Sequence, residues 1–165
     1  MQKTWIIFYF ILIATVSLGL KLYTVDFTVL PSEDTFGYVL RGIAHNNGDF
    51  TEPPRKTLGW SIFISPFFHM TDSNNFLDYV NIIRGLGLGI SIITIVPVYL
   101  LSRKFFDAKY SLCAVGLFAF EPHLNHVSGQ GISEPLYILA IILSLYFMLN
   151  KNSNYSYLSF LTIGL

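Results

Sequence analysis

Long apolar segments constrain this chain more than any other feature of its sequence. Residues 80–102 contain one charged side chain, Arg84, and are otherwise largely apolar. A helix needs about 20 such residues to cross the hydrocarbon core of a bilayer, so this segment is long enough to span a membrane. Residues 5–25 also qualify, because the aliphatic stem of Lys21 can carry its ammonium group to the interface.

Three further apolar segments are shorter. They are residues 108–122, 135–149 and 157–165. The five segments together predict an all-α fold, a multi-span transmembrane helical bundle. We expect the chain to be the N-terminal part of a longer polytopic protein, because the fifth segment has no polar flank.

The composition supports a membrane protein and excludes some other classes. Hydrophobic residues make up 53% of the chain and charged residues 12%, whereas about a quarter of a soluble domain is charged. Ten basic residues balance ten acidic ones. The chain therefore lacks the excess of positive charge that would indicate a nucleic-acid partner. The one cysteine, Cys113, cannot form an internal disulfide and is interpreted as a small packing residue.

The first apolar segment has a second interpretation, as a cleaved signal peptide. It follows one basic residue, Lys3, and contains the small residues Ser17 and Gly19. The apolar stretch is longer than the core of a signal peptide, which favours retention as a membrane anchor.

Positive charges predict how the chain is oriented. Lys and Arg favour the cytoplasmic side of short loops. If the spans alternate, the basic residues that share this side are Lys3, Arg103, Lys104, Lys109 and Lys151. The N-terminus is then cytoplasmic, and residues 26–79 and 121–133 lie outside. The predicted location is a multi-pass protein of the cell membrane, or of the endoplasmic reticulum in a eukaryote.

The predicted outer loop, residues 26–79, is too long to be a bare connection. Its stretch SEDTFGYVLRGIAHNNGDF begins with residues that start a helix, and its apolar residues then recur at helical spacing. Residues 58–70 are apolar but too short to span the membrane. Both stretches predict helices that lie in the membrane interface.

The carboxylates Asp34 and Glu134 each have an ordinary structural interpretation. An acid in the first turn of a helix satisfies free N–H groups and suits the helix dipole. Glu134 precedes Pro135, a common first helical residue. Arg84 can likewise reach the interface or pair with Asp78. These roles leave a functional one open, because a carboxylate fixed at a helix start is ready to accept a proton or bind a cation.

The order of these features resembles the N-terminal region of the GT-C superfamily of integral-membrane glycosyltransferases. The nearest subgroups are the dolichyl-phosphate-mannose protein mannosyltransferases and the lipid A aminoarabinose transferases. The matching stretches are EDTFGYVLRGIAHNNGDF, PPRKTLGWSIFISPFF, NIIRGLGLGI, SRKFFDAKYS and FAFEPHLNHVSGQGISEPLYILAIIL. Many relatives have Asp-Glu where this chain has Glu33-Asp34, and the Pro-Pro-Leu-Tyr motif is altered because Arg55 follows Pro54. Residues 1–165 would form the N-terminal part of such a domain.

The resemblance implies a polyprenyl-phosphate-linked sugar as donor and a protein, lipid or glycan as acceptor. Asp34 is the candidate base, with Glu33 in reserve, and Glu134 stands where the family often has an acid. The candidate substrate-binding residues are Tyr38, Arg55, Arg84, His123 and His126. Arginine suits the geometry of a phosphate leaving group. Direct attack on the anomeric carbon would invert it.

Several alternatives remain open at the level of the sequence. A divalent cation could bridge Asp34 and Glu134 to the phosphate, but no residue decides whether a metal cofactor is used. His123 and His126 have no third histidine and no cysteine in their loop. Tyr38 and Trp60 also fit an aromatic belt. The competing function is a non-catalytic membrane scaffold or an inactive fragment of such an enzyme.

Overall fold

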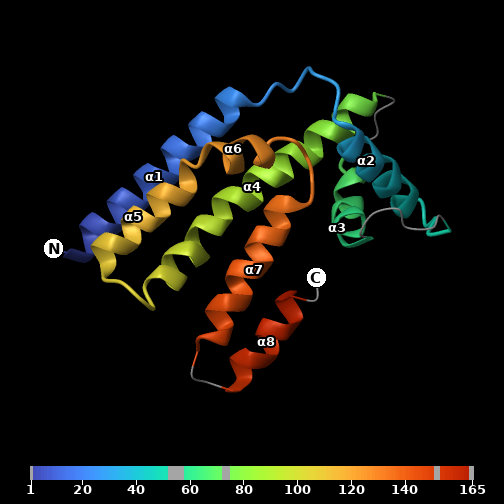
Figure 1. The fold of residues 1–165 in the computed structure, drawn as a ribbon. Coiled ribbons are helices and arrows are strands. Elements are labelled where there is room, and N and C mark those ends of the chain that lie inside the picture. Colours follow the sequence, from blue (N-terminus) through green and yellow to red (C-terminus); the bar gives the residue numbers. More distant parts are fainter. Residues whose placement is uncertain (1, 52–57, 72–74, 151–152, 164–165) are drawn as a thin grey trace.

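The computed structural model describes residues 2–51, 58–71, 75–150 and 153–163. These residues form eight helices and no strand, so they are all-α as predicted (Figure 1). The helices are α1 (Gln2–Thr24), α2 (Glu33–Asn46), α3 (Leu58–Phe68), α4 (Phe76–Ser102), α5 (Ala108–Ala119), α6 (Pro122–Ser128), α7 (Glu134–Met148) and α8 (Ser153–Ile163).

Two of these helices are long and apolar enough to cross a membrane. They are the stretch Thr4–Thr24 within α1, and α4. Helices α5 and α7 have 12 and 15 residues. At 1.5 Å per residue they reach only about 18 and 22 Å, short of a hydrocarbon core of about 30 Å. The two longest predicted spans therefore correspond to helices long enough to cross a membrane, and the other three segments correspond to shorter helices.

The predicted segment 108–122 is divided into two helices. Helix α5 ends at Ala119, and Pro122 opens α6 with Glu121 as its N-cap. Proline is well suited to the first turn because its missing N–H would have no helical partner there. By contrast, Pro97 lies inside α4 without ending it.

The long helices run back and forth, which sorts the connections into two groups. In Figure 1 the start of α1, the α4–α5 turn and the end of α7 lie toward one end of the molecule. The α1–α2 linker, α6 and the α6–α7 turn lie toward the other end. The basic turn after α4 and the acidic first turn of α2 are therefore separated by the length of the bundle.

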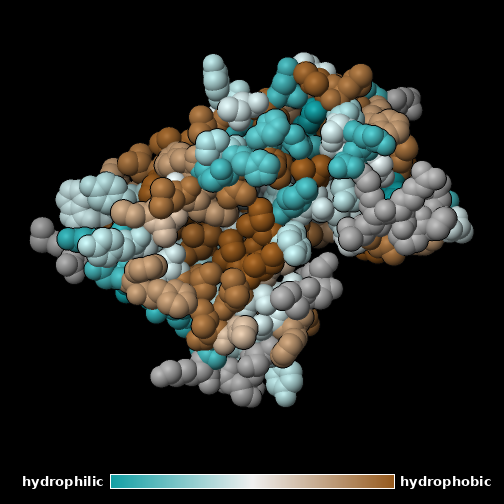
Figure 2. Space-filling view, viewed as in Figure 1, coloured by the Kyte–Doolittle hydropathy of each residue, from teal (hydrophilic) through white to brown (hydrophobic). Residues whose placement is uncertain are grey.

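Apolar side chains face outward along the long helices (Figure 2). The exposed large residues of α1 include Trp5, Ile7, Phe8, Ile11, Leu12, Val16 and Leu22. An apolar exterior of this extent is costly in water and suits contact with lipid or with other helices. This surface is the main structural support for a membrane location.

Helices α2 and α3 pack together beside the start of α4 and share a buried core with it. Its fully buried members include Val39, Trp60, Ile64, Phe68 and Ile83. The two helices approach closely where α2 has Gly42, because a Cβ there would meet the Phe68 ring at 2.5 Å. Helix α2 ends before Gly48, whose φ of 79° is a backbone conformation that glycine adopts without strain.

Candidate functional site

The predicted acidic pair lies on the first turn of α2. Ser32 is the N-cap, and its Oγ accepts a hydrogen bond from the Thr35 N–H at 3.4 Å. Ser32, and not Asp34, is therefore the N-cap of α2. Glu33 and Asp34 are exposed residues inside the first turn, where their negative charge suits the helix dipole.

Three side chains of α2 and α3 form hydrogen bonds with the turn between α6 and α7. Thr35 Oγ1 donates to the Gln130 carbonyl at 2.7 Å, and Trp60 Nε1 donates to the Gly131 carbonyl at 3.2 Å. The Tyr38 hydroxyl lies 3.3 Å from the Ser133 hydroxyl. Residues 130–133, which we call the clamped turn, thus fix α2 against the start of α7.

Glycine allows the clamped turn to fit between these helices. Gly131 has a φ of 78°, and a Cβ on it would meet Ile83 Cγ1 at 2.8 Å. A non-glycine residue would be strained by both the backbone and the contact. The close approach lets the two carbonyls reach Thr35 and Trp60.

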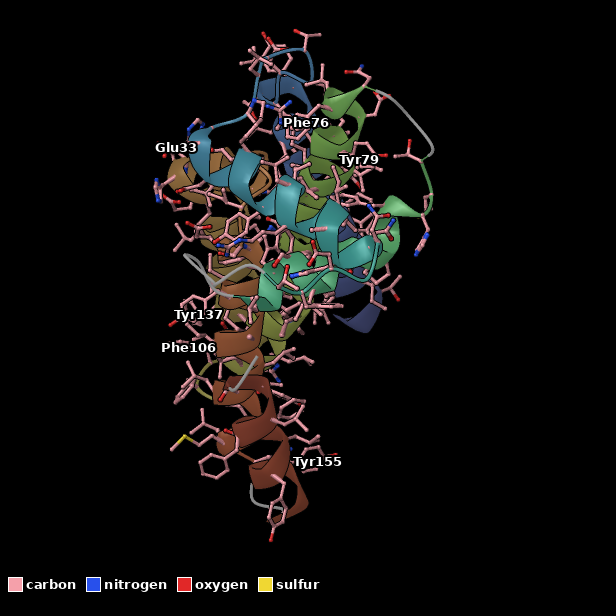
Figure 3. All side chains as sticks on the ribbon, turned by 90° about the vertical axis from the view of Figure 1, so that its right-hand side faces the viewer. Glu33, Phe76, Tyr79, Phe106, Tyr137 and Tyr155 are labelled. Atoms are coloured by element: carbon pink, nitrogen blue, oxygen red, sulfur yellow. The ribbon has the colours of Figure 1, made fainter. Side chains whose placement is uncertain are left out.

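The clamped turn brings the regions of the two distant acids together. Asp34 immediately precedes Thr35 in α2, and Glu134 immediately follows Ser133 at the start of α7. Both carboxylates are exposed. Figure 3 shows Glu33 at the beginning of α2, on the same side of the view as Tyr137 of α7.

Two aromatic residues have structural roles that their sequence positions did not reveal. Tyr38 and Trp60 are 8% and 2% exposed, and both contact the clamped turn. Neither lies in an exposed aromatic belt. The structure places Tyr38, a predicted substrate-binding residue, in the joint between α2 and α7. The paired glycines of GQGIS were the available signal for a tight turn.

Arg84 holds the linker that joins α1 to α2. Its guanidinium donates to the Val29 carbonyl at 3.0 Å and to Asn81 Oδ1 at 3.2 Å. The side chain is buried, so the interpretation that it snorkels to the interface is wrong. Guanidinium has five N–H donors, so these two bonds leave donors for a ligand.

A pocket of about 260 Å³ lies beside Arg84, between the linker and the end of α6. Its polar lining residues are Thr24, Asp26, Ser32, Arg84, His126 and Gln130. Hydrogen bonds from the side chain and backbone of Thr28 hold the pKa of Asp26 below its usual value. The pocket thus presents an anion, a cation and neutral donors together.

The two predicted histidines differ in their relation to this pocket. His126 lines it, and its Nε2 lies 2.7 Å from the Gln130 side-chain nitrogen. His123 is exposed on α6 but is not among the lining residues. Arg55, the remaining predicted substrate contact, lies outside the described residues.

Lys21 points into the protein, contrary to the prediction that it reaches the interface. It is 2% exposed, and its Nζ donates to Ser128 Oγ at 3.2 Å. One turn earlier, Ser17 Oγ donates to the Ala119 carbonyl at 2.9 Å. These bonds attach α1 to the α5–α6 region. Cys113, predicted as a packing residue, is instead exposed.

Glu121 caps α6, so the stability of the folded protein should decrease as the pH falls. Hydrogen bonding to the Leu124 N–H is the largest cause that lowers its pKa, with smaller contributions from His123 and Lys21. Because the folded state lowers this pKa, the stabilisation is present at neutral pH and is lost as pH falls through the folded value. We expect Glu121→Gln to lower the melting temperature at pH 7 and to have little effect near pH 3.

Thermal unfolding followed by circular dichroism across pH 3–7 tests this expectation. Glu33→Gln is a control: Glu33 is an exposed acid on the first turn of α2, where Ser32 is the N-cap, so this change should not alter the α6 contribution. A Glu121→Gln effect of equal size at both ends of the pH range would contradict the capping role.

The described residues contain no group of three or more His, Cys, Asp or Glu side chains that could hold a metal ion. The structure therefore shows no complete protein metal site within this part of the chain. A cation held by Asp34 and Glu134 together with a substrate phosphate stays a prediction.

Comparison of the chain with protein-family models, with curated proteins and with solved structures found no match. The resemblance to membrane glycosyltransferases therefore depends on the order of the sequence features. The functional interpretation depends on the clamped turn, the two acids beside it and the Arg84 pocket.

Proposed function

We propose that this chain is part of a multi-pass membrane glycosyltransferase that uses a polyprenyl-phosphate-linked sugar. The observation that carries the proposal is the docking of α2 on the clamped turn. It brings the exposed Asp34 and Glu134 to the end of the bundle that also contains the Arg84 pocket. The N-terminus would be cytoplasmic, with α2 and α3 in the outer interface.

Each residue has a defined part in the proposed reaction. The acceptor hydroxyl attacks the anomeric carbon, and its proton passes to Asp34. The bond from that carbon to the phosphate oxygen breaks, and the electron pair leaves with the polyprenyl phosphate. Arg84 donates hydrogen bonds to this phosphate, assisted by His126. The attack occurs opposite the leaving group, so the anomeric configuration inverts.

Glu134 has a supporting part because it lies at the start of α7, beside the clamped turn. It can accept a hydroxyl hydrogen bond from the sugar or from the acceptor. Glu33 neighbours Asp34 on the first turn of α2 and is the reserve base. The alternative function is that of a non-catalytic scaffold. Such a protein could bind a ligand in the Arg84 pocket but would need no general base.

A donor panel tests the proposal directly. The protein, produced from its complete reading frame, is incubated in detergent with polyprenyl-phosphate derivatives of common hexoses and pentoses. We expect release of polyprenyl phosphate from one donor, measured by mass spectrometry, and an inverted product by NMR. Binding without release across the panel, in the presence of hydroxyl acceptors, would favour the scaffold and contradict the enzyme.

A further inference from the structure

The connection between α4 and α5 carries an exposed group of positive charges. Arg103, Lys104 and Lys109 are all exposed, and the segment 103–110, which we call the basic turn, contains one acid, Asp107. The turn lies at the opposite end of the bundle from the clamped turn (Figure 1). The proposed reaction uses none of its residues.

The one acid of the basic turn is already engaged. Asp107 is the N-cap of α5, and its Oδ1 accepts from the backbone N–H groups of Lys109 at 3.0 Å and Tyr110 at 3.2 Å. No ion pair joins the three cations to a carboxylate within the described part of the chain. Their charge is therefore available to an external anion.

Local contacts shape the basic turn. Arg103 Nη1 donates to the Phe106 carbonyl at 2.7 Å, which closes the turn. Lys104 Nζ lies 5.2 Å from the centre of the Tyr146 ring of α7, at a distance typical of a cation–π contact. These contacts restrain two of the cations without neutralising them.

Exposed aromatic side chains accompany the charges. Phe105, Phe106 and Tyr110 are 64%, 56% and 67% exposed, and Phe106 lies at the outer edge of the helices in Figure 3. Tyrosine at the end of an apolar helix favours the headgroup region of a bilayer, and exposed phenylalanines enter the boundary between headgroups and acyl chains. Neighbouring lysines and arginines attract anionic lipid there. The combination of the two residue types fits a lipid surface better than a free anion.

We propose that the basic turn binds the phosphate of an anionic phospholipid, with its aromatic side chains inserted among the headgroups. The inference rests on the membrane location that the proposed function includes. Each basic residue near an anionic surface strengthens binding by about fivefold. Because the charges are exposed, salt should weaken the interaction.

Native mass spectrometry in detergent tests the proposal with phosphatidylglycerol and phosphatidylcholine as probes. We expect the unaltered protein to retain phosphatidylglycerol in preference to phosphatidylcholine. Lys104→Gln with Lys109→Gln should reduce the preference by more than about tenfold, from two charges at about fivefold each. This pair leaves the Arg103 bond that closes the turn in place.

The control pair, Arg41→Gln with Lys56→Gln, removes the same charge from the segment before α4 and should leave the preference unchanged. Equal retention of both lipids, or an equal loss in the control pair, would overturn the proposal. Competition by inorganic phosphate as effective as by phosphatidylglycerol would also overturn it, because a free-anion site would then explain binding. Sugar transfer without lipid preference would remove this inference and leave the enzyme proposal intact.

Discussion

Replacing Asp34 with asparagine is expected to lower sugar transfer by about 10²–10⁴-fold, the usual contribution of a positioned general base. Asparagine keeps the shape of the side chain but cannot accept the proton of the attacking hydroxyl. Helix α2 should remain intact, because Ser32 is its cap and Asp34 is exposed. The measurement is the initial rate of product formation with the donor found in the panel.

Glu33→Gln is the matched control for this prediction. It removes the same charge from the same exposed turn, so a general electrostatic effect would slow both variants equally. We expect Glu33→Gln to stay within a few-fold of the unaltered rate, while Asp34→Asn loses transfer. A normal rate in Asp34→Asn would remove Asp34 as the base, and a selective loss in Glu33→Gln would assign that role to Glu33.

The sequence was a good guide to helices and a poorer one to their lengths. Continuous apolar runs predicted helical structure in the five apolar segments and in residues 58–70. Apolar residues at helical spacing predicted it in the stretch that begins at Ser32. Neither pattern showed that residues 108–122 would divide, although Pro122 supplied a signal. A proline can start a helix or lie within one, as Pro97 does, and only the surrounding contacts decide.

Polar groups were predicted less well, since their partners come from distant parts of the chain. Lys21 was assigned to the interface because a long stem usually allows that. Ser128, 107 positions away, supplies a partner inside the protein instead. Tyr38 was assigned to substrate because the family pattern has a tyrosine there, yet its hydroxyl lies against Ser133. Residue spacing along one helix carries no information about such partners.

The candidate site was also predicted in part: the acids were identified from the sequence, but the contacts that position them were not. From the alternation of the spans, the sequence predicted that the two acids lie on one side of the membrane, and the structure shows that α2 and the start of α7 both lie beside the clamped turn. Nothing in the sequence indicated that Thr35 and Trp60 would hold the acids in place, because both interactions are with backbone carbonyls of residues 130 and 131. Backbone acceptors are present at every residue and leave no pattern in a sequence.

Trp60 is therefore the residue whose loss should disturb the fold most. Its side chain is 2% exposed, stacks on Phe63 with ring centres 5.6 Å apart and donates to the Gly131 carbonyl. We expect Trp60→Ala to lower the free energy of unfolding by about 3–5 kcal/mol, the range for removing a large buried aromatic side chain. Denaturant titration in detergent, followed by circular dichroism, measures this loss.

Two further variants separate packing from hydrogen bonding. Trp60→Phe keeps most of the buried ring and removes the N–H donor, so it should cost about 1–3 kcal/mol because the Gly131 carbonyl loses its partner. Trp5→Ala removes the only other tryptophan, which is 58% exposed, and should change stability by about 0.5 kcal/mol or less. Similar losses in Trp5→Ala and Trp60→Ala would show that Trp60 is not the anchor of the clamped turn.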